Sequence, residues 1–443
     1  MVAALLLTAF VLGAAAQSDA IATQAFTLRE RAEVVATITA ACGRCDWREP
    51  GREAAVLELW LDGEYSQHVV LTRGAQPSPY RVMLGPLGAG AHELSVRRDA
   101  ARSAADAGTA IVEGIAFESF GEDRPEHLWL SRAPFLYSRP GTLEQFTDLP
   151  LLMYAETGVP GEAGGTYRVQ YTAIFSHEDG GTPADRLMAT WGRTTDIEFV
   201  FGVTEADASG PSRELIQGEG HRWIPFDGPR LGDHPLLWVA TVNNMVASTG
   251  PAGLARFAPA PELAVLAERS REAVMDAHPW TYAVTSAEVA REGRVAAGAP
   301  AGSERIPEPR QYATVEACAD VSNATLAFDV GVRGADGSIA WHATDRDQPA
   351  FRIARGGCFR GGAPLPAGTS PQEIAGLRVR AYPRPARQGE PASASDSARV
   401  VLRRVNQVFM LDASHSPAPS PIRWTGEMAV PTDGRPVEVP PAR

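Results

Sequence analysis

The sequence contains no lysine, so its 41 basic residues are all arginines. This absence excludes chemistry that needs a lysine amine, namely Schiff-base catalysis, pyridoxal enzymes and P-loop nucleotidases. Positive charge is also scarce relative to negative charge, because 53 acidic residues leave a formal net charge of -12. A nucleic-acid-binding protein needs a basic surface that displaces counterions, so we expect no nucleic-acid partner.

Long hydrophobic runs are lacking except at the start of the chain. The apolar run 2–12, followed by three alanines, predicts a signal peptide over residues 1–16 that is cleaved before Gln17. The basic residue that usually precedes such a run is missing. The run is shorter than the roughly 20 residues of a membrane-spanning helix. We therefore expect a secreted or periplasmic protein with no transmembrane segment in the mature chain.

Several catalytic signatures are also missing. The chain has no G-x-S-x-G elbow, no H-E-x-x-H helix motif and no glycine-rich dinucleotide fingerprint after a strand. These absences argue against a serine hydrolase of the elbow type, a zincin protease and a Rossmann enzyme.

The four cysteines form one close pair and one distant pair. Cys42 and Cys45 make a C-x-x-C, and Cys318 and Cys358 lie far from them. We predict one disulfide within each pair, as suits an oxidising compartment. A redox C-x-x-C is the alternative, but no βαβ pattern flanks it. A four-thiolate zinc site would normally show a second close pair.

Abundant glycine (42) and proline (35), with alternating apolar segments, predict a mainly β protein built from several β-sandwiches. The Asp62-Gly63 dipeptide between two such segments indicates a hairpin. An apolar stripe that includes Leu263, Leu266 and Val274 predicts one amphipathic helix, stopped by Pro279. The expected organisation is an N-terminal β-sandwich (17–123), a central β-sandwich (124–295) with a helix at 261–277, a linker (296–309) and a C-terminal β-domain (310–443).

The segment 175–200 contains the residues that are best suited to bind a metal or to act in catalysis. Asp196 and Glu198 lie two apart on a predicted strand, so both should point to one side, with Ile197 and Phe199 facing a core on the other. With the preceding loop, the candidate metal ligands are His177, Glu178, Asp179, Asp185, Asp196 and Glu198. Oxygen ligands suit Ca²⁺ or Mg²⁺, and a histidine among carboxylates suits Zn²⁺. The alternative is an ordinary solvated strand face and loop.

A second candidate site lies in the loop 218–235. His221, Trp223 and Asp227 combine a flat aromatic face with polar groups, a combination that suits carbohydrate binding. The alternative is that Trp223 closes the edge of a sandwich, because large aromatic residues are usually mostly buried.

Parts of the central segment resemble a known family. The strings APFLYSRPG, DLPLLMYAE, YRVQYTAIFS, TTDIEFVFGV and DHPLLWVATVNN, within about 133–245, resemble vacuolar-protein-sorting-related and necrosis-inducing-like secreted β-sandwich proteins. The resemblance implies a β-sandwich. From the necrosis-inducing members it also implies a divalent cation, held here at Asp196 and Glu198 with His177 as a substitute ligand. Ile197 stands where those proteins have tryptophan.

From these features we expect an exported, non-catalytic binding protein, associated with a glycan or another cell-envelope component. The alternative is a metal-dependent hydrolase in the central segment. There the carboxylates would hold a divalent cation (Ca, Mg or Zn), and His177 would ligate it or act as a general base. A purely structural assembly component is a third possibility.

Overall fold

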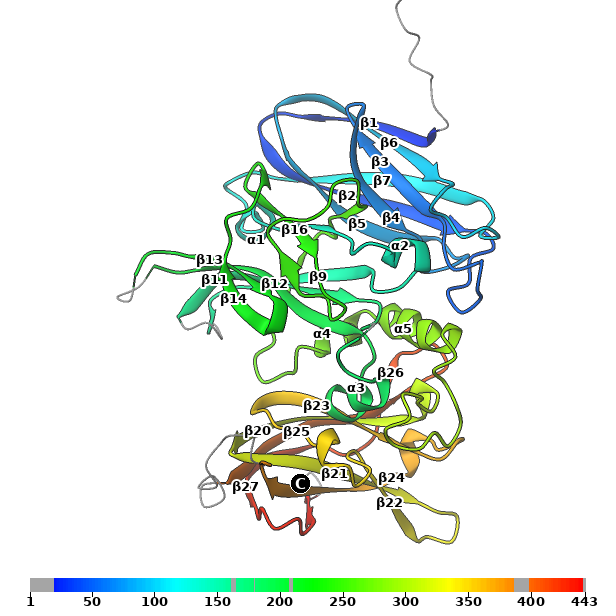
Figure 1. The fold of residues 1–443 in the computed structure, drawn as a ribbon, viewed down its shortest axis with the longest axis vertical. Helices are drawn as coiled ribbons and strands as arrows, with labels where there is room; N and C mark the ends of the chain where they lie inside the picture. Colours follow the sequence, from blue (N-terminus) through cyan, green and yellow to red (C-terminus); the bar gives the residue numbers. More distant parts are fainter. Residues whose placement is uncertain (1–19, 161–164, 179, 207–209, 386–397, 441–443) are drawn as a thin grey trace, which may run out of the picture.

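The structure is a computed structural model that describes residues 20–160, 165–178, 180–206, 210–385 and 398–440. It is mainly β, which confirms the predicted fold class of stacked β-sheets with few helices. Three pairs of sheets follow one another along the long axis, with the N-terminal part at the top of Figure 1 and the C-terminal part at the bottom. The predicted signal peptide, 1–16, lies outside the described residues.

The first sandwich pairs the sheet β5-β2-β7 with the sheet β1-β6-β3-β4. Asp62 and Gly63 both have positive φ between β3 and β4, which confirms the predicted two-residue hairpin. Leu57 and Leu59 are fully buried between the sheets, whereas the alternate residue Glu58 points to the outer face. The strands are β1 Ala20–Leu28, β2 Ala32–Cys42, β3 Val56–Leu61, β4 Glu64–Val70, β5 Ser78–Leu87, β6 Gly90–Asp99 and β7 Ala110–Phe120.

The central sandwich has a large sheet, β14-β13-β12-β11-β9-β19 with β10 beside β11, and a smaller sheet, β15-β16-β8-β18 with β17 beside β16. The larger sheet comprises β9 Pro150–Glu156, β10 Val159–Pro160, β11 Thr166–Phe175, β12 Asp196–Thr204, β13 Glu214–Gly218, β14 Arg222–Pro225 and β19 Glu262–Leu263. The smaller sheet comprises β8 Phe135–Tyr137, β15 Arg230–Leu231, β16 His234–Val239, β17 Val246–Ala247 and β18 Arg256–Phe257.

The third sandwich pairs β23-β20-β25-β26, with β27 beside β25, against β22-β21-β24-β28. Its core is a single cluster of aliphatic and phenylalanine side chains from both sheets. The strands are β20 Tyr312–Ser322, β21 Ala324–Arg333, β22 Ile339–Ala343, β23 Gly357–Pro364, β24 Ile374–Pro383, β25 Arg399–Leu411, β26 Pro417–Pro419, β27 Trp424–Val430 and β28 Val437–Glu438.

The predicted helix over 261–277 is wrong. Residues Glu262–Leu263 form strand β19, which pairs in parallel with β9, and Leu263 is 41% exposed rather than packed in a helical stripe. Only the last part of the segment is helical, as the short helix α4, Ala273–Ala277, which ends before Pro279 as predicted. Pro279 also precedes helix α5, Trp280–Arg291. Sheet pairing thus overrides the local helical pattern. The other helices are α1 His127–Leu130, α2 Thr142–Gln145 and α3 Ala184–Trp191, and the 3₁₀ turns are Glu219–His221, Pro309–Gln311, Pro349–Phe351 and Pro371–Glu373.

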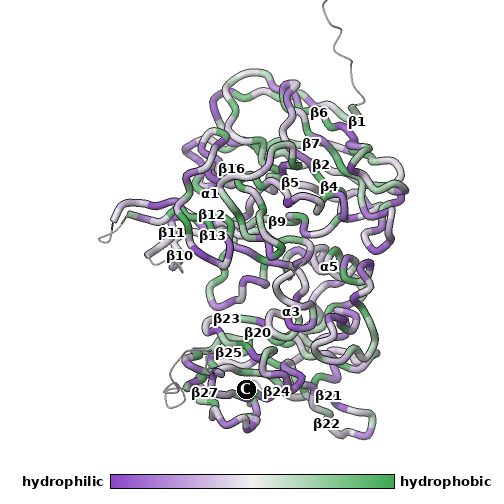
Figure 2. The backbone as a smooth tube through the Cα atoms, in the orientation of Figure 1, coloured by the Kyte–Doolittle hydropathy of each residue, from purple (hydrophilic) through white to green (hydrophobic). Residues whose placement is uncertain are grey.

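The three sandwiches pack closely against one another. The central segment 256–260 pairs with the first sandwich, because Ala258 O accepts a hydrogen bond from Met83 N at 2.8 Å and Ala260 N donates to Arg81 O at 3.1 Å. The expected linker 296–309 is also tied to the fold, since Ile306 is fully buried and its backbone pairs with Arg294. In Figure 2 hydrophobic stretches run along the strands within each sandwich, and many outer turns are hydrophilic.

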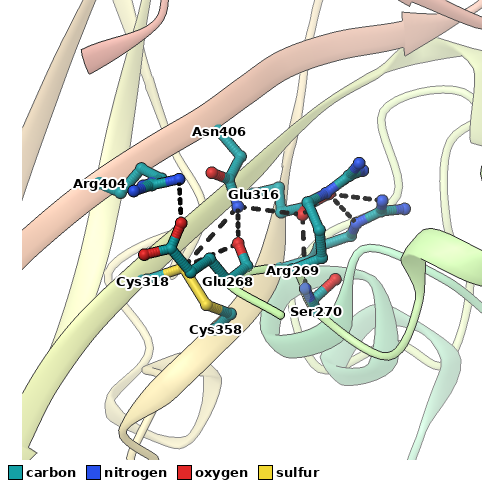
Figure 3. Close-up of a disulfide and its surroundings, with 9 residues drawn as sticks. Glu268, Arg269, Ser270, Glu316, Cys318, Cys358, Arg404 and Asn406 are labelled. Atoms are coloured by element: carbon teal, nitrogen blue, oxygen red, sulfur yellow. Dashed lines mark hydrogen bonds and ion pairs between the residues drawn. A yellow bond between two sulfur atoms is a disulfide. The ribbon is translucent and has the colours of Figure 1, made fainter. Parts of the chain in front are cut away.

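Both predicted disulfides are confirmed, Cys42–Cys45 and Cys318–Cys358. The second joins the neighbouring strands β20 and β23, and the segment that precedes α4 lies against it (Figure 3). Beside this disulfide, Asn406 Nδ2 donates to the backbone carbonyl of Glu268 at 2.6 Å. This contact holds a loop of the central sandwich on the third sandwich.

A buried arginine completes the junction between the central and third sandwiches. Arg360 on β23 is 1% exposed and donates to Glu316 on β20 (2.6 Å), Asp276 on α4 (2.6 Å) and Tyr282 on α5 (2.8 Å). Burial alone would raise the pKa of Glu316, but hydrogen bonds from Arg269 and the charge of Arg360 lower it to about 2. The junction is therefore a fully paired charge network, which fixes how the two sandwiches pack.

Candidate functional site

The carboxyl groups of Asp196 and Glu198 lie on the same side of β12, as predicted, but they face inward rather than outward. Across the antiparallel pairing with β11, Glu198 lies opposite Ala173 and Asp196 opposite Phe175, both of which belong to the core of the central sandwich. Asp196 is 1% exposed and Glu198 is 7% exposed. The expectation of an outward-facing pair on a solvated strand face is therefore wrong.

The apolar residues of β12 do not share one face, because the strand contains a bulge. The pairing with β11 shifts register between Tyr171 and Thr172, so Val200 is an extra residue. Ile197 packs against the segment of α4 and α5, whereas Phe201 lies in the sandwich core. The bulge cannot be read from an alternating sequence, and it explains why strict alternation predicted the wrong face.

Glu178 joins Asp196 and Glu198 in a group that we call the carboxyl cluster. Burial, together with the charge of Asp196, raises the pKa of Glu178 to about 7. Burial also raises the pKa of Asp196, and it raises that of Glu198 well above the ordinary value, with a further contribution from the Asp196 charge. Asp196 and Glu198 are hydrogen-bonded to each other, and the sign of each effect makes Glu198 the protonated donor.

Residues outside the predicted set hold the carboxyl cluster in place. Asn244 Nδ2 donates to Asp196 Oδ2 at 3.1 Å, and it also lies 3.3 Å from Asp148 Oδ1 and from His177 O. The charge of the buried Arg193 opposes the rise in pKa of all three carboxyl groups. Asn244 and Asp148 had no recognisable sequence signal, because they come from loops far from β12 in the chain.

The other predicted ligands do not join this cluster. His177 is fully buried, with Nδ1 2.9 Å from Thr194 O and Nε2 2.9 Å from Arg294 Nη1. Nε2 also lies 3.7 Å from Glu292 Oε2, and neither ring nitrogen is turned toward Asp196. Asp185 Oδ2 instead accepts from Gly302 N at 2.6 Å. Asp179 lies outside the described residues.

The predicted metal set therefore does not converge on one point in the described part of the chain. Among the described residues, the only group of at least three potential ligand side chains whose donor atoms all lie within 4.8 Å of one another is Glu58, His68 and Asp99 in the first sandwich. No local sequence pattern marks this group, because its members lie on three separate strands.

The second predicted site, His221 with Trp223 and Asp227, is dispersed in the structure. The Trp223 ring packs edge-on against Phe199 with centroids 4.3 Å apart, and it also contacts Tyr167. Asp227 accepts a hydrogen bond from Ser248 at 3.0 Å, and His221 lies 4.0 Å from Glu198. Trp223 thus packs at the edge of the sandwich, as in the alternative interpretation, and it stays partly exposed.

A pocket lies between the first and central sandwiches. Its volume is about 290 Å³, close to the lower limit of small-molecule sites. Strands β4 and β5 form one wall, and β9, β19 and the start of α5 form the other. The pocket arises because the segment 257–262 crosses from the edge of β5 to the edge of β9, which leaves a gap bounded by side chains of both sandwiches.

The lining of this pocket is apolar along most of its length and polar at one end. Val82, Leu151 and Phe257 contribute apolar surface, and Trp280 and Tyr80 contribute aromatic surface. At the polar end, His278 Nε2 donates to Glu262 Oε1 at 2.5 Å. Arg73 lies over the Trp280 ring at 3.9 Å and thereby covers one face of the indole.

No described helix combines the length and apolar character that crossing a membrane requires. The two disulfides suit an oxidising compartment.

Comparison with protein-family models finds no match to the chain, and comparison with curated protein sequences finds none either.

Proposed function

We propose that the protein is a non-catalytic binding protein, exported from the cell, and that its ligand occupies the pocket between the first and central sandwiches. The observation that carries this proposal is the lining of the pocket, with apolar walls and one polar end formed by the His278–Glu262 pair. Small-molecule sites typically have this composition, because apolar surface supplies affinity and a few polar groups orient the ligand.

The lining also indicates a class of ligand. A small molecule with an apolar or aromatic body can fill the space beside Val82 and Leu151. A polar end can accept from or donate to the His278–Glu262 pair, and an anionic group also gains from the nearby Arg73. A glycan is a weaker fit, because the Trp280 face that a sugar would stack on is partly covered by Arg73.

We do not propose the hydrolase alternative. It requires His177, Glu178, Asp179, Asp196 and Glu198 around one cation. The ring nitrogens of His177 instead contact Thr194 and Arg294, and Asp179 lies outside the described residues. The pocket between the first and central sandwiches is not lined by Asp196 or Glu198 either, so a substrate held there would not reach them.

A fluorescent probe with an aryl body and an anionic group, anilinonaphthalene sulfonate, tests the proposal. We expect saturable binding with one probe per chain at pH 7.5. Leu151→Trp fills the pocket and should weaken binding by at least tenfold, whereas Ile224→Trp, at an exposed position on β14, should leave it unchanged. Circular dichroism should show that both variants are folded.

Competition then identifies the ligand class. Displacement of the probe by arylalkanoic acids supports the proposed class, and displacement only by oligosaccharides would replace it with a glycan site. Absence of saturable binding to the folded wild type, or equal binding to Leu151→Trp, would refute a ligand site in this pocket.

A further inference from the structure

We propose that Glu58, His68 and Asp99 form a binding site for a single zinc-class divalent cation on the outer face of the first sandwich. We call these three residues the His68 site. His68 also lines the pocket between the first and central sandwiches, so the cation would lie at the wall of that pocket. The sequence pattern did not single out these residues.

The sheet register brings the three side chains together. Glu58 on β3 lies opposite His68 on β4, and Asp99 is the last residue of β6, the strand on the other side of β3. Directly paired residues share a face, so both neighbours of β3 present their polar groups on the face of Glu58. The central sandwich covers this face, since the rings of His68 and Phe257 are 6.4 Å apart.

The imidazole of His68 carries the strongest evidence. The side chain of His68 is only 4% exposed, and its buried Nε2 atom has no hydrogen-bond partner. This atom nevertheless lies 3.4 Å from Asp99 Oδ2 and 3.7 Å from Glu58 Oε1. A buried polar atom without a partner is destabilising, and a cation between the three atoms would satisfy it.

The distances match what a small cation needs. Zinc binds histidine nitrogen and carboxylate oxygen at about 2.0–2.2 Å, so ligand atoms at tetrahedral positions are about 3.3–3.6 Å apart. The contacts of 3.4 and 3.7 Å between Nε2 and the two oxygens are close to that separation. Calcium, in contrast, takes six to eight oxygen ligands, and an imidazole with two carboxylates supplies too few of them.

Neighbouring groups hold each ligand in position. His68 Nδ1 lies 2.6 Å from Tyr65 Oη, a contact that leaves Nε2 free to present its lone pair when Nδ1 carries the proton. Trp60 Nε1 donates to Glu58 Oε2 at 3.1 Å, which leaves Oε1 toward the site. Backbone amides of the following turn donate to Asp99 Oδ1 at 3.0 and 3.1 Å.

The charges around the site favour a dication over a simple ion pair. Two carboxylates, of Glu58 and Asp99, face the Nε2 atom of His68 and bring two negative charges to the site. Arg102 donates to Asp99 Oδ2 at 2.9 Å and balances one negative charge. Glu58, with 26% of its side chain exposed, keeps the site open to solvent for entry of the ion and for a water as fourth ligand.

Metal titration of the full chain tests the proposal. After dialysis against a chelator and then buffer, calorimetric titration with ZnCl₂ at pH 7.5 should show one saturable site per chain, with at most weak Ca²⁺ binding. His68→Asn should abolish this binding, and Glu58→Gln should weaken it by at least tenfold. Titration with Co²⁺ should give visible absorption of the intense four-coordinate type that His68→Asn removes.

Matched controls lie on the same strands. His92→Asn removes an imidazole whose two nitrogens already contact Asp62 at 2.8 Å and Gly88 O at 2.9 Å, and Glu64→Gln removes an exposed carboxylate of β4. Both should bind zinc like the wild type. If His68→Asn fails to fold by circular dichroism, Glu58→Gln decides the question, because its side chain is partly exposed. No saturable zinc binding to the wild type, or equal binding by Glu58→Gln, overturns the proposal.

Discussion

The carboxyl cluster of the central sandwich and the His68 site of the first sandwich gather similar groups on neighbouring strands. Glu178, Asp196 and Glu198 are held by an amide, by buried arginines and by a proton that Asp196 and Glu198 share. In the His68 site, a buried imidazole nitrogen lies between two carboxylates with no hydrogen bond. In the carboxyl cluster the carboxyl groups themselves have partners, although the Oδ1 atom of the neighbouring Asn244 is buried without one. In the His68 site the atom without a partner is the imidazole nitrogen of the site itself.

The difference teaches that the density of acidic residues in a sequence is a poor guide to a metal site. The segment 175–200 was predicted to bind a metal because its charged residues are close together in the chain. In the structure, these residues pair with groups from other segments of the fold. The His68 site is spread over 42 positions, from Glu58 to Asp99 (99 − 58 + 1), and is assembled by strand pairing. The two clusters differ in whether their ionisable side chains have hydrogen-bond partners, not in their density of charge.

The largest effect should come from removing a counter-charge of the carboxyl cluster. Arg193→Met removes the arginine that contacts Glu272 at 3.5 Å, and with it one of the two arginines, Arg193 and Arg271, whose charges lower the pKa values of Asp196 and Glu198. Breaking a buried charge pair from one side typically costs about 3–5 kcal/mol. Urea unfolding should show this loss for Arg193→Met and less than about 0.5 kcal/mol for Arg186→Met, at an exposed position on α3. Equal, small losses would mean that the cluster needs no counter-charge.

We expect Glu178→Gln to increase the free energy of unfolding, by less than Arg193→Met decreases it. The folded pKa of Glu178 is raised to about 7, so the folded state binds a proton more tightly than the unfolded chain does. Its contribution to stability is therefore fully present below about pH 4.5 and is lost as the pH rises through about 7. The variant should be more stable than the wild type by up to about 3 kcal/mol at pH 8, with no gain at pH 4.

Thermal unfolding at several pH values checks this prediction, with Glu205→Gln, at an exposed position, as the control. A gain that does not change with pH would show that Glu178 is ionised throughout, against the effect of its burial.

Zinc should distinguish the two clusters through the free energy of unfolding, by an amount comparable to the effect of Glu178→Gln. A ligand that binds only the folded state at a hundred times its dissociation constant adds about 2.7 kcal/mol to the free energy of unfolding. We expect zinc to raise the melting temperatures of the wild type and of Glu178→Gln equally, and to raise that of Glu58→Gln clearly less. If Glu178→Gln lost the effect while Glu58→Gln kept it, the cation would belong to the carboxyl cluster.

The smallest effect should follow Tyr65→Phe. The substitution removes the hydroxyl that lies 2.6 Å from His68 Nδ1. The hydroxyl also accepts a hydrogen bond from Arg256 N at 3.2 Å, and the loss of each such bond costs about 0.5–1.5 kcal/mol of stability. Because the contact with His68 also orients the imidazole, the zinc dissociation constant should rise by about 10–100-fold. Tyr137→Phe, whose ring stacks on Trp238, serves as the control. An unchanged zinc affinity would mean that Tyr65 does not position His68.

Much of the fold was predictable from local patterns. The Asp62-Gly63 hairpin follows from the preference of these residues for positive φ, and the disulfides follow from cysteine spacing within each segment. The helix at 261–277 was mispredicted because Glu262–Leu263 finds a pairing partner in β9, which no local signal encodes. The face of β12 was mispredicted because the bulge at Val200 shifts the alternation.

The carboxyl cluster and the His68 site also differ in how much of each could be predicted from local sequence patterns. The sequence predicted that Asp196 and Glu198 share a side of their strand, because side chains alternate with a period of two. It could not predict that this side faces the sandwich core, nor that Asn244 and Arg193 would meet the carboxyl groups there. The pocket and the His68 site had no local signal at all, because each is lined by residues from several strands.

By itself, the sequence determined the class of the fold, the hairpin and the cysteine pairs, because each depends on residues that are neighbours in the chain or on overall composition. Only the tertiary structure decided which polar atoms are buried together, which of them find partners and where the sandwiches leave space between them. The physical reason is that desolvation and pairing depend on contacts between distant segments, such as β3 with β6 or the segment 256–260 with β5.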